Sequence, residues 1–177
     1  NSVLAVEPTP GALKRLRDNL AANGVENVKV FEGVLGKSQG QVEFHIVPGR
    51  EEYSSMRPIA HQHAVEFATE TKKVECVPLD HLVASYGLTP GFVKMDVEGA
   101  EWEVLQGAEK TFSLHRPILL SELDENLLQG FGADSERVCN WLQSLGYKVI
   151  DAETGGRVRP YITHSILAIP RERTSSE

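Results

Sequence analysis

Residues 92–101 read Phe-Val-Lys-Met-Asp-Val-Glu-Gly-Ala-Glu, and this stretch decides the fold class. Its first half is an apolar run interrupted by one lysine, which predicts a buried strand. After it, apolar residues recur at helical spacing, at Val104, Leu105 and Ala108. Gly99 allows a tight turn between the two parts. The stretch therefore predicts a strand that runs directly into a helix, which is the repeating unit of α/β folds.

The same alternation recurs on both sides of this stretch. We expect strands over residues 1–7, 28–34, 73–77 and 117–123, and helices over residues 10–22, 79–86 and 134–145. Residues 41–47 alternate apolar and polar side chains, which is typical of a half-exposed strand. Strands at 147–150 and 164–169 are expected to form an antiparallel pair. The sequence thus predicts one α/β domain over residues 1–170, with a mostly parallel sheet and a flexible tail at 171–177.

The composition is that of an ordinary globular protein. The chain has 177 residues, of which 41% are apolar and 24% charged, and its net charge is −7. This acidic balance gives no general attraction to nucleic acid or to anionic membranes. The chain has two cysteines without metal-ligand spacing, which favours a reducing compartment such as the cytoplasm. No run of about 18 apolar residues occurs, so no membrane span is predicted.

Ligands of parallel sheets bind beyond the carboxyl ends of the strands. Glu7 ends the first predicted strand, immediately before Pro8. An acid in this place can accept hydrogen bonds from both hydroxyls of a ribose. The alternative is a glutamate that is solvated or caps the next helix, and the residues alone leave both open.

The strand at 92–97 carries a second group of charges. Lys94 and Asp96 lie two residues apart, so their side chains share one face of the strand. A lysine in an apolar strand is costly to bury unless it is paired, and Asp96 is the natural partner. Glu98 and Glu101 add two carboxylates at the start of the next helix. Such a cluster at the ligand edge of a sheet is typical of functional sites, whereas the alternative is a capped helix with a structural ion pair.

Three further residues are candidates. Glu122 ends the strand that follows in sequence and could face Asp96, or it could be a buried acid held by a backbone donor. Ser54 and Ser55 offer hydroxyl groups in a long polar loop over residues 48–72, which predicts a lid, a substrate contact or a plain solvated loop. No metal site is predicted, although Asp96, Glu98 and Glu122 together could act as oxygen ligands of a divalent cation.

These residues resemble the FkbM methyltransferase family. The similarity runs in order from about residue 3 to 123, and its motifs are Leu-Ala-Val-Glu-Pro at 4–8, Gly-Val-Leu-Gly at 33–36, Val-Pro-Leu-Asp-His-Leu at 77–82, Val-Lys-Met-Asp-Val-Glu-Gly-Ala-Glu at 93–101 and Pro-Ile-Leu-Leu-Ser-Glu at 117–122. The motif at 93–101 is the most specific. Family members carry a strand and a glycine-rich turn before the Glu-Pro strand. We therefore expect this chain to lack the first strand of its sheet, as an N-terminally truncated domain.

The resemblance implies a Rossmann-like methyltransferase sheet and S-adenosylmethionine as the cofactor, usually for O-methylation. By position, Glu7 and Pro8 would bind the cofactor, with Glu7 on the ribose hydroxyls. Val34 and Leu35 would lie beside the adenine. Asp96 would lie by the methionine end of the cofactor or by the methyl acceptor.

The remaining candidates would serve the acceptor and the chemistry. The resemblance places Lys94 and Glu122 on the acceptor side. Our hypothesis for the catalytic residues is that Asp96 positions the cofactor or the acceptor and that Glu122 or Lys94 assists removal of the acceptor proton. Glu98, Glu101, Ser54 and Ser55 would lie on the substrate side. The expected acceptor is a hydroxyl group of a sugar, a lipid or a small metabolite. The alternative is a non-catalytic Rossmann-like module that binds a nucleotide or a partner protein.

Overall fold

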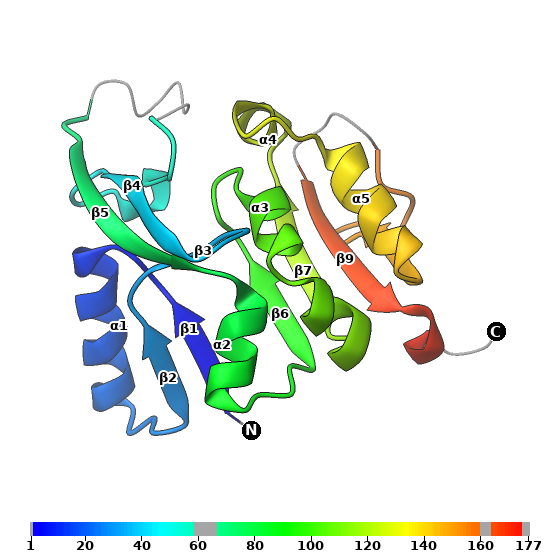
Figure 1. Ribbon diagram of the computed structural model, residues 1–177, viewed down its shortest axis with the longest axis horizontal. Coiled ribbons are helices and arrows are strands. Elements are labelled where there is room, and N and C mark those ends of the chain that lie inside the picture. The colour runs from blue at the N-terminus through cyan, green and yellow to red at the C-terminus, as the bar shows by residue number, and fades with distance from the viewer. Residues whose placement is uncertain (1, 59–66, 160–163, 175–177) are drawn as a thin grey trace.

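The computed structural model describes residues 2–58, 67–159 and 164–174. Strands and helices alternate along the chain (Figure 1). The strands are β1 (Val3–Val6), β2 (Val28–Phe31), β3 (Val34–Leu35), β4 (Gly40–Ile46), β5 (Glu70–Val77), β6 (Phe92–Met95), β7 (Ile118–Leu123), β8 (Tyr147–Asp151) and β9 (His164–Pro170). The helices are α1 (Pro10–Ala22), α2 (Leu79–Tyr86), α3 (Glu101–Gln106), α4 (Glu125–Gly130) and α5 (Ser135–Ser144), with short turns η1 (Glu51–Tyr53), η2 (Thr111–His115) and η3 (Arg171–Arg173).

The strands form three sheets rather than one. Their orders are β1-β2, β3-β5-β4 and β6-β7-β9-β8. The pairs β1–β2, β3–β5 and β6–β7 are parallel, whereas β4–β5, β7–β9 and β8–β9 are antiparallel. The mixed α/β class and the antiparallel pair β8–β9 are as expected, but the sheet is not mostly parallel.

The expected strand at 28–34 is divided at Gly33. A side chain at Gly33 would come within 2.6 Å of the backbone oxygen of Glu75, so the chain passes β5 at close range there. Residues before Gly33 pair with β1, and residues after it pair with β5. The long loop is also shorter than expected, because β5 begins at Glu70.

The main core lies between the four-stranded sheet and the helices α3 and α5, which cover one face of it (Figure 1). Leu105 from α3 and Leu142 from α5 are fully buried, and Leu119 and Ile166 meet them from the sheet. Tyr147 is also buried, and its hydroxyl donates a hydrogen bond of 3.1 Å to the backbone oxygen of Phe112. This core fixes β6 and β7 in place and thereby supports their carboxyl ends.

The helix α3 ends at Gln106, although the helical spacing of apolar residues continues to Ala108. Asp80 of α2 explains why the chain turns there. Its carboxylate accepts hydrogen bonds from the backbone nitrogen atoms of Lys110 and Thr111, at 2.9 and 2.7 Å, and from the Thr111 hydroxyl. These bonds cap the next segment, η2, as a separate element.

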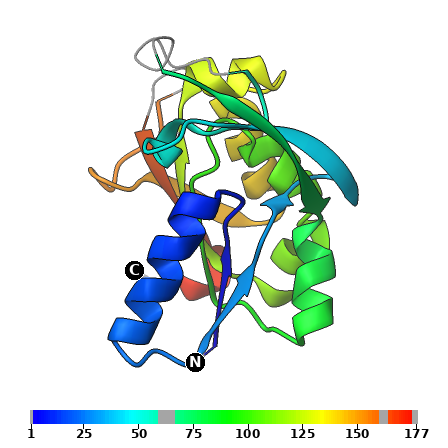
Figure 2. The same ribbon diagram turned by 90° about the vertical axis from the view of Figure 1, so that its left-hand side faces the viewer.

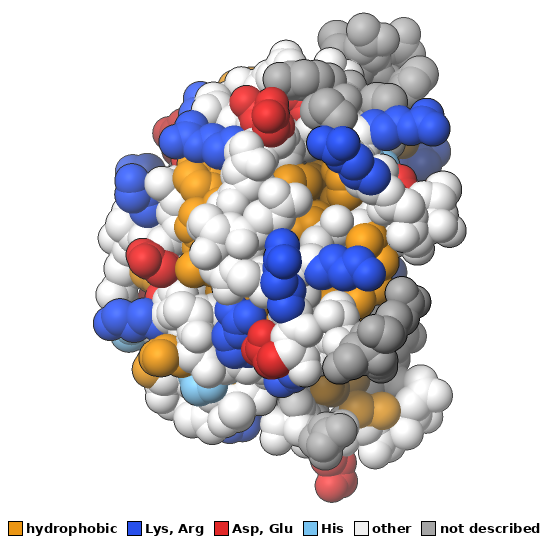
Figure 3. Space-filling model, turned by 90° about the vertical axis from the view of Figure 1, so that its right-hand side faces the viewer, with side chains coloured by type: hydrophobic (Ala, Val, Ile, Leu, Met, Phe, Trp, Pro, Cys, Tyr) orange, Lys and Arg blue, Asp and Glu red, His pale blue; other side chains and the backbone are white. Residues whose placement is uncertain are grey.

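The surface is not uniformly acidic. Figure 3 shows Lys and Arg side chains spread over the face that carries α5 and the end of β9. Exposed basic residues on the elements of this side include Arg137, Lys148, Arg171 and Arg173. Among the helices that the structure describes, none is both long enough and apolar enough to cross a membrane.

The core predicts a clear contrast between two leucines. Leu105 is 0% exposed and Leu114 is 73% exposed. We expect Leu105→Ala to lower the free energy of unfolding by about 2–5 kcal/mol, because it leaves a cavity in the core. Leu114→Ala is the matched control and should change it by less than about 0.5 kcal/mol. Urea unfolding measures both, and similar losses for the two variants would contradict this account of the core.

Candidate active site

The register of β6 against β7 brings Asp96 and Glu122 to the same level. Met95 pairs with Ser121 in the parallel ladder, and the next residue along each strand is one of the two acids. Both acids are exposed, on the face opposite the buried Met95 and Ser121. Adjacent strands lie about 4.8 Å apart. The two acids therefore follow paired positions at the carboxyl ends of neighbouring strands.

Lys94 lies on the same face and forms an ion pair with Asp96, with 2.9 Å between Nζ and Oδ2. The expected pairing is confirmed, but the lysine is not buried, since its side chain is 62% exposed. An exposed ion pair contributes little to stability. Its effect is to hold a positive charge next to the carboxylates.

A left-handed turn joins β6 to α3. Glu98 has a φ of 51° and Gly99 a φ of 95°, a region that residues with a side chain rarely adopt. Gly99 also packs tightly, because a Cβ atom there would come within 2.6 Å of the backbone oxygen of Leu127. The turn reverses the chain and leaves Asp96 at the edge of the sheet.

Glu101 lies beneath this turn and is not on the surface. The residue is 2% exposed, and burial raises the pKa of its carboxyl group to about 7, with a smaller contribution from the charge of Glu98. Its Oε1 atom accepts hydrogen bonds from the backbone nitrogen atoms of Val97 and Gly99, at 3.4 and 3.3 Å. The helical spacing of Glu101 with the buried Val104 and Leu105 is the sequence signal that indicates this burial.

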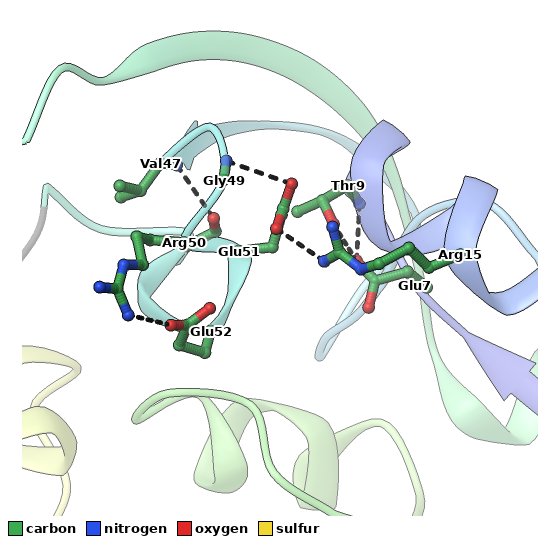
Figure 4. A network of polar contacts seen from close by, with 9 residues as sticks. Glu7, Thr9, Arg15, Val47, Gly49, Arg50, Glu51 and Glu52 are labelled. Carbon is green, nitrogen blue, oxygen red and sulfur yellow. Dashed lines mark hydrogen bonds and ion pairs between the residues drawn. The ribbon is translucent and has the colours of Figure 1, made fainter.

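Glu7 lies at the end of β1, where its carboxylate holds the start of α1. Its Oε1 atom accepts hydrogen bonds from the backbone nitrogen and the hydroxyl of Thr9, at 2.7 and 2.6 Å. Within the described residues, Oε2 makes no hydrogen bond, and Figure 4 shows it pointing away from Thr9. One carboxylate oxygen atom of Glu7 thus caps the start of α1, as the alternative interpretation expects. The other oxygen atom is available to a ligand.

The loop after β4 connects the surroundings of Glu7 with those of Glu98. Figure 4 shows Glu51 of this loop in an ion pair with Arg15 of α1, at 2.7 Å. Further along the loop, the Ser55 hydroxyl donates to the backbone oxygen of Glu98 at 3.4 Å. Ser54 is buried, and its hydroxyl accepts a hydrogen bond of 3.0 Å from the backbone nitrogen of Val47. Sequence reasoning missed the ion pair, since Arg15 and Glu51 are far apart in the chain and no local pattern joins them.

Two hollows adjoin these residues. One of about 20 Å³ lies against Glu98 and is lined by Tyr53, Ser55, Arg57, Pro58, Glu98, Leu127, Gly130 and Phe131. A second, open hollow of about 450 Å³ lies between α1 and β5 and reaches the candidate site at Pro8. The smaller hollow has room for about one water molecule.

The structure places Val34 and Leu35 away from the open surface. Val34 is buried in a small second core with Phe44, Ile46 and Cys76. Leu35 is partly buried and packs against the main core. Their expected contact with an adenine ring stays a prediction.

No group of three or more His, Cys, Asp or Glu side chains lies close enough together to hold a metal ion, among the residues that the structure describes. Asp96, Glu98 and Glu122 are therefore not gathered as the ligands of a divalent cation. The metal-assisted alternative has no support from this arrangement.

Residues 1–149 match the model of the methyltransferase FkbM domain. The chain belongs to this family. A curated relative is the 2-O-methyltransferase NoeI of Sinorhizobium fredii (strain NBRC 101917 / NGR234), which is 28% identical over 134 residues that make up 70% of this chain and 54% of the relative. The FkbM chain described here thus spans about half the length of that relative.

The fold of this FkbM domain is also similar to a solved structure. The crystal structure of methyltransferase FkbM from Methylobacillus flagellatus KT superposes with a TM-score of 0.59 at 18% identity. The superposition covers 94% of this chain and 36% of the other. At this identity, the likeness concerns the fold.

The turn after β6 predicts that replacing Gly99 lowers the stability of the protein. We expect Gly99→Ala to lower the free energy of unfolding by about 2–4 kcal/mol, because the left-handed backbone and the contact with Leu127 both oppose a Cβ atom. Gly24→Ala is the control: its φ is also left-handed, at 61°, but no atom lies within 4 Å of its Cβ position. That variant should lose only about 1 kcal/mol. Equal losses in urea unfolding would show that the Leu127 contact is unimportant.

Proposed function

We propose that this protein is an S-adenosylmethionine-dependent methyltransferase that transfers a methyl group to a hydroxyl oxygen. The observation that carries the proposal is the register of β6 and β7, which brings Asp96 and Glu122 to the same level at the carboxyl ends of these strands, in a chain of the FkbM family. That edge is where ligands of parallel strands bind. The name of the relative NoeI, a 2-O-methyltransferase, supports an oxygen atom as the acceptor.

The residues present fit the cofactor in one specific respect. Glu7 follows β1, and one of its carboxylate oxygen atoms is free of hydrogen bonds within the described residues. We assign it to the ribose hydroxyls, with Pro8 beside it. Val34 and Leu35 would lie toward the adenine, where the buried side chain of Val34 and the partly buried side chain of Leu35 would support the backbone beside the ring.

The acceptor side is assigned to the second group of charges. S-adenosylmethionine supplies a methyl group on a sulfonium, which an oxygen nucleophile can attack in line. In such a transfer the C–O bond would form as the C–S bond breaks, the C–S electron pair would stay on sulfur, and the acceptor hydroxyl would have to give up its proton. Asp96 or Glu122 can accept that proton, and Lys94 stabilises the neighbouring carboxylates by its charge. Holding the acceptor close and aligned supplies much of the rate.

The rest of the assigned site is formed by the turn and the loop. Glu98 and Ser55 lie in contact with each other, and we place them with Ser54 on the substrate side. The acceptor proposed from the sequence is a sugar, a lipid or a small metabolite. The two cysteines are free and buried, which fits the reducing cytoplasm proposed from the sequence.

We further propose that another parallel strand completes the sheet between β1 and β6. In the described part of the chain, β1 pairs only with β2, and β6 pairs only with β7. These two strands run alongside each other as neighbouring sheet edges (Figures 1 and 2). Val3 is 48% exposed and Phe92 57% exposed, although parallel strands are usually buried on both faces. An added strand with a glycine-rich turn would satisfy both edges.

The role of Asp96 predicts a kinetic effect. We expect Asp96→Asn to lower turnover about a hundredfold or more, the usual scale for loss of an acid–base group. Asp18→Asn, an exposed acid of α1, is the control and should keep normal turnover. A change of less than about threefold in the Asp96 variant would remove Asp96 from the mechanism.

The proposed strand predicts a difference in cofactor binding. Calorimetry with S-adenosylhomocysteine would compare residues 1–177 with an N-terminally extended form of the protein. We expect binding by the extended form and much weaker binding by residues 1–177, because the added strand supplies the remaining contacts. Binding by neither form would favour the non-catalytic module, and equal binding by both would contradict the proposed strand.

A further inference from the structure

Glu101 is a buried acid, and only one of its two carboxylate oxygen atoms has hydrogen-bond partners in the described structure. The residue is 2% exposed, and its Oε2 atom is buried with no hydrogen-bond partner in the described structure. No Lys or Arg forms an ion pair with it there. Burying an acid in this way costs free energy. We therefore expect the carboxyl group to make an interaction that an apolar residue could not make.

What Glu101 does is hold the turn between β6 and α3. Its Oε1 atom accepts from the backbone nitrogen atoms of both Val97 and Gly99. Those two nitrogen atoms flank Glu98, whose φ of 51° is unfavourable for a residue with a side chain. The backbone oxygen of Glu98 also accepts a hydrogen bond from the Ser55 hydroxyl, at 3.4 Å. Glu101 is therefore the inner support of a turn that would not keep this shape alone.

The turn after β6 determines where the nearby site residues lie. Asp96 immediately precedes it, and Glu98 lies within it. We propose that Glu101 is a positioning residue: its buried carboxyl group fixes the turn from Val97 to Gly99 and so holds Asp96 level with Glu122. That it serves methyl transfer rests on the proposed function, but its hold on the turn does not.

The surroundings of Glu101 make this support dependent on pH. Glu98 on the turn faces it with a like charge. Helix α4, which packs on Gly99, carries the buried Glu125, whose carboxylate is occupied by the Ser135 backbone nitrogen. The loop after β4 brings Arg57 to the hollow beside Glu98. Burial dominates, and it raises the pKa of Glu101 from its ordinary 4.5 to about 7.

The sign of the effect follows. Because the pKa of Glu101 is higher in the folded state than in the unfolded state, the folded protein holds an extra proton between about pH 4.5 and pH 7. This group therefore favours folding at low pH, and its contribution is lost as the pH rises through that window. Above it, the ionised carboxylate makes stronger hydrogen bonds to the two backbone N–H groups. The N–H groups of the turn should thus sense the proton directly.

The test is a pH titration of backbone amide signals by nuclear magnetic resonance, in the wild-type protein and in Glu101→Gln. We expect the Val97 and Gly99 amide signals of the wild type to shift together with a midpoint near pH 7. In Glu101→Gln, which keeps the shape and an acceptor oxygen but cannot ionise, that shift should be lost. Glu103→Gln, two residues along the same helix, is the control and should keep it.

Each other outcome counts against the proposal. If the two amide signals titrate near pH 4.5, Glu101 is not held as described. If the shift persists in Glu101→Gln, another group, with Glu98 the first candidate, controls the turn. The Asp96 amide must move with the pair, because a turn that titrates while Asp96 stays fixed would not position it. Failure of the N-terminally extended protein to bind S-adenosylhomocysteine, with the titration intact, would instead count against the proposed function.

Discussion

The left-handed turn at Glu98 and Gly99 is the constraint on which the rest of the structure depends. It reverses the chain within a few residues, so that α3 returns over the sheet from which it came. The return buries Leu105 against the sheet and gives the domain its main core. The same reversal leaves Asp96 outside the core, at the end of β6. Core and site are thus two consequences of one turn, and Gly99 is the residue whose lack of a side chain permits it.

The candidate site is assembled from parts that are distant in the chain. Glu7 comes from the end of β1, and Asp96 and Glu122 come from the ends of β6 and β7. The loop after β4 contacts both groups of residues. Its Glu51 pairs with Arg15 of α1, and its Ser55 donates a hydrogen bond to the backbone oxygen of Glu98. A ligand between the two sides would lie against this loop. The loop can therefore contribute to the site even though its serines are committed to backbone hydrogen bonds.

Some of this was predictable from sequence because local patterns determine it. The helix at Pro10–Ala22 begins at a proline and ends at Asn-Gly, and its expected bounds match those of α1. The pairing of Lys94 with Asp96 follows from the two-residue period of a strand. The antiparallel pair at the C-terminus was also found, and so was the strand-to-helix change after β6.

Other features depend on contacts that no local pattern contains. Nothing in residues 28–34 indicates that β5 passes Gly33 closely enough to divide the strand. The short helix α4 was not expected. Glu101 is expected on the substrate side, whereas the packing of α3 buries it beneath the turn. The expected strand at residues 1–7 is present as β1, but it is half-exposed along an edge that makes no ladder in the described chain.

The central claim is that the carboxyl ends of β1 and β6 serve one ligand. Amide chemical shifts recorded while S-adenosylhomocysteine is added to the N-terminally extended protein test it most directly. The account predicts that the signals of Thr9 and Val97, which report on Glu7 and on the turn, shift along one binding curve. A ligand that moves only one of them, or moves the two along different curves, would contradict it.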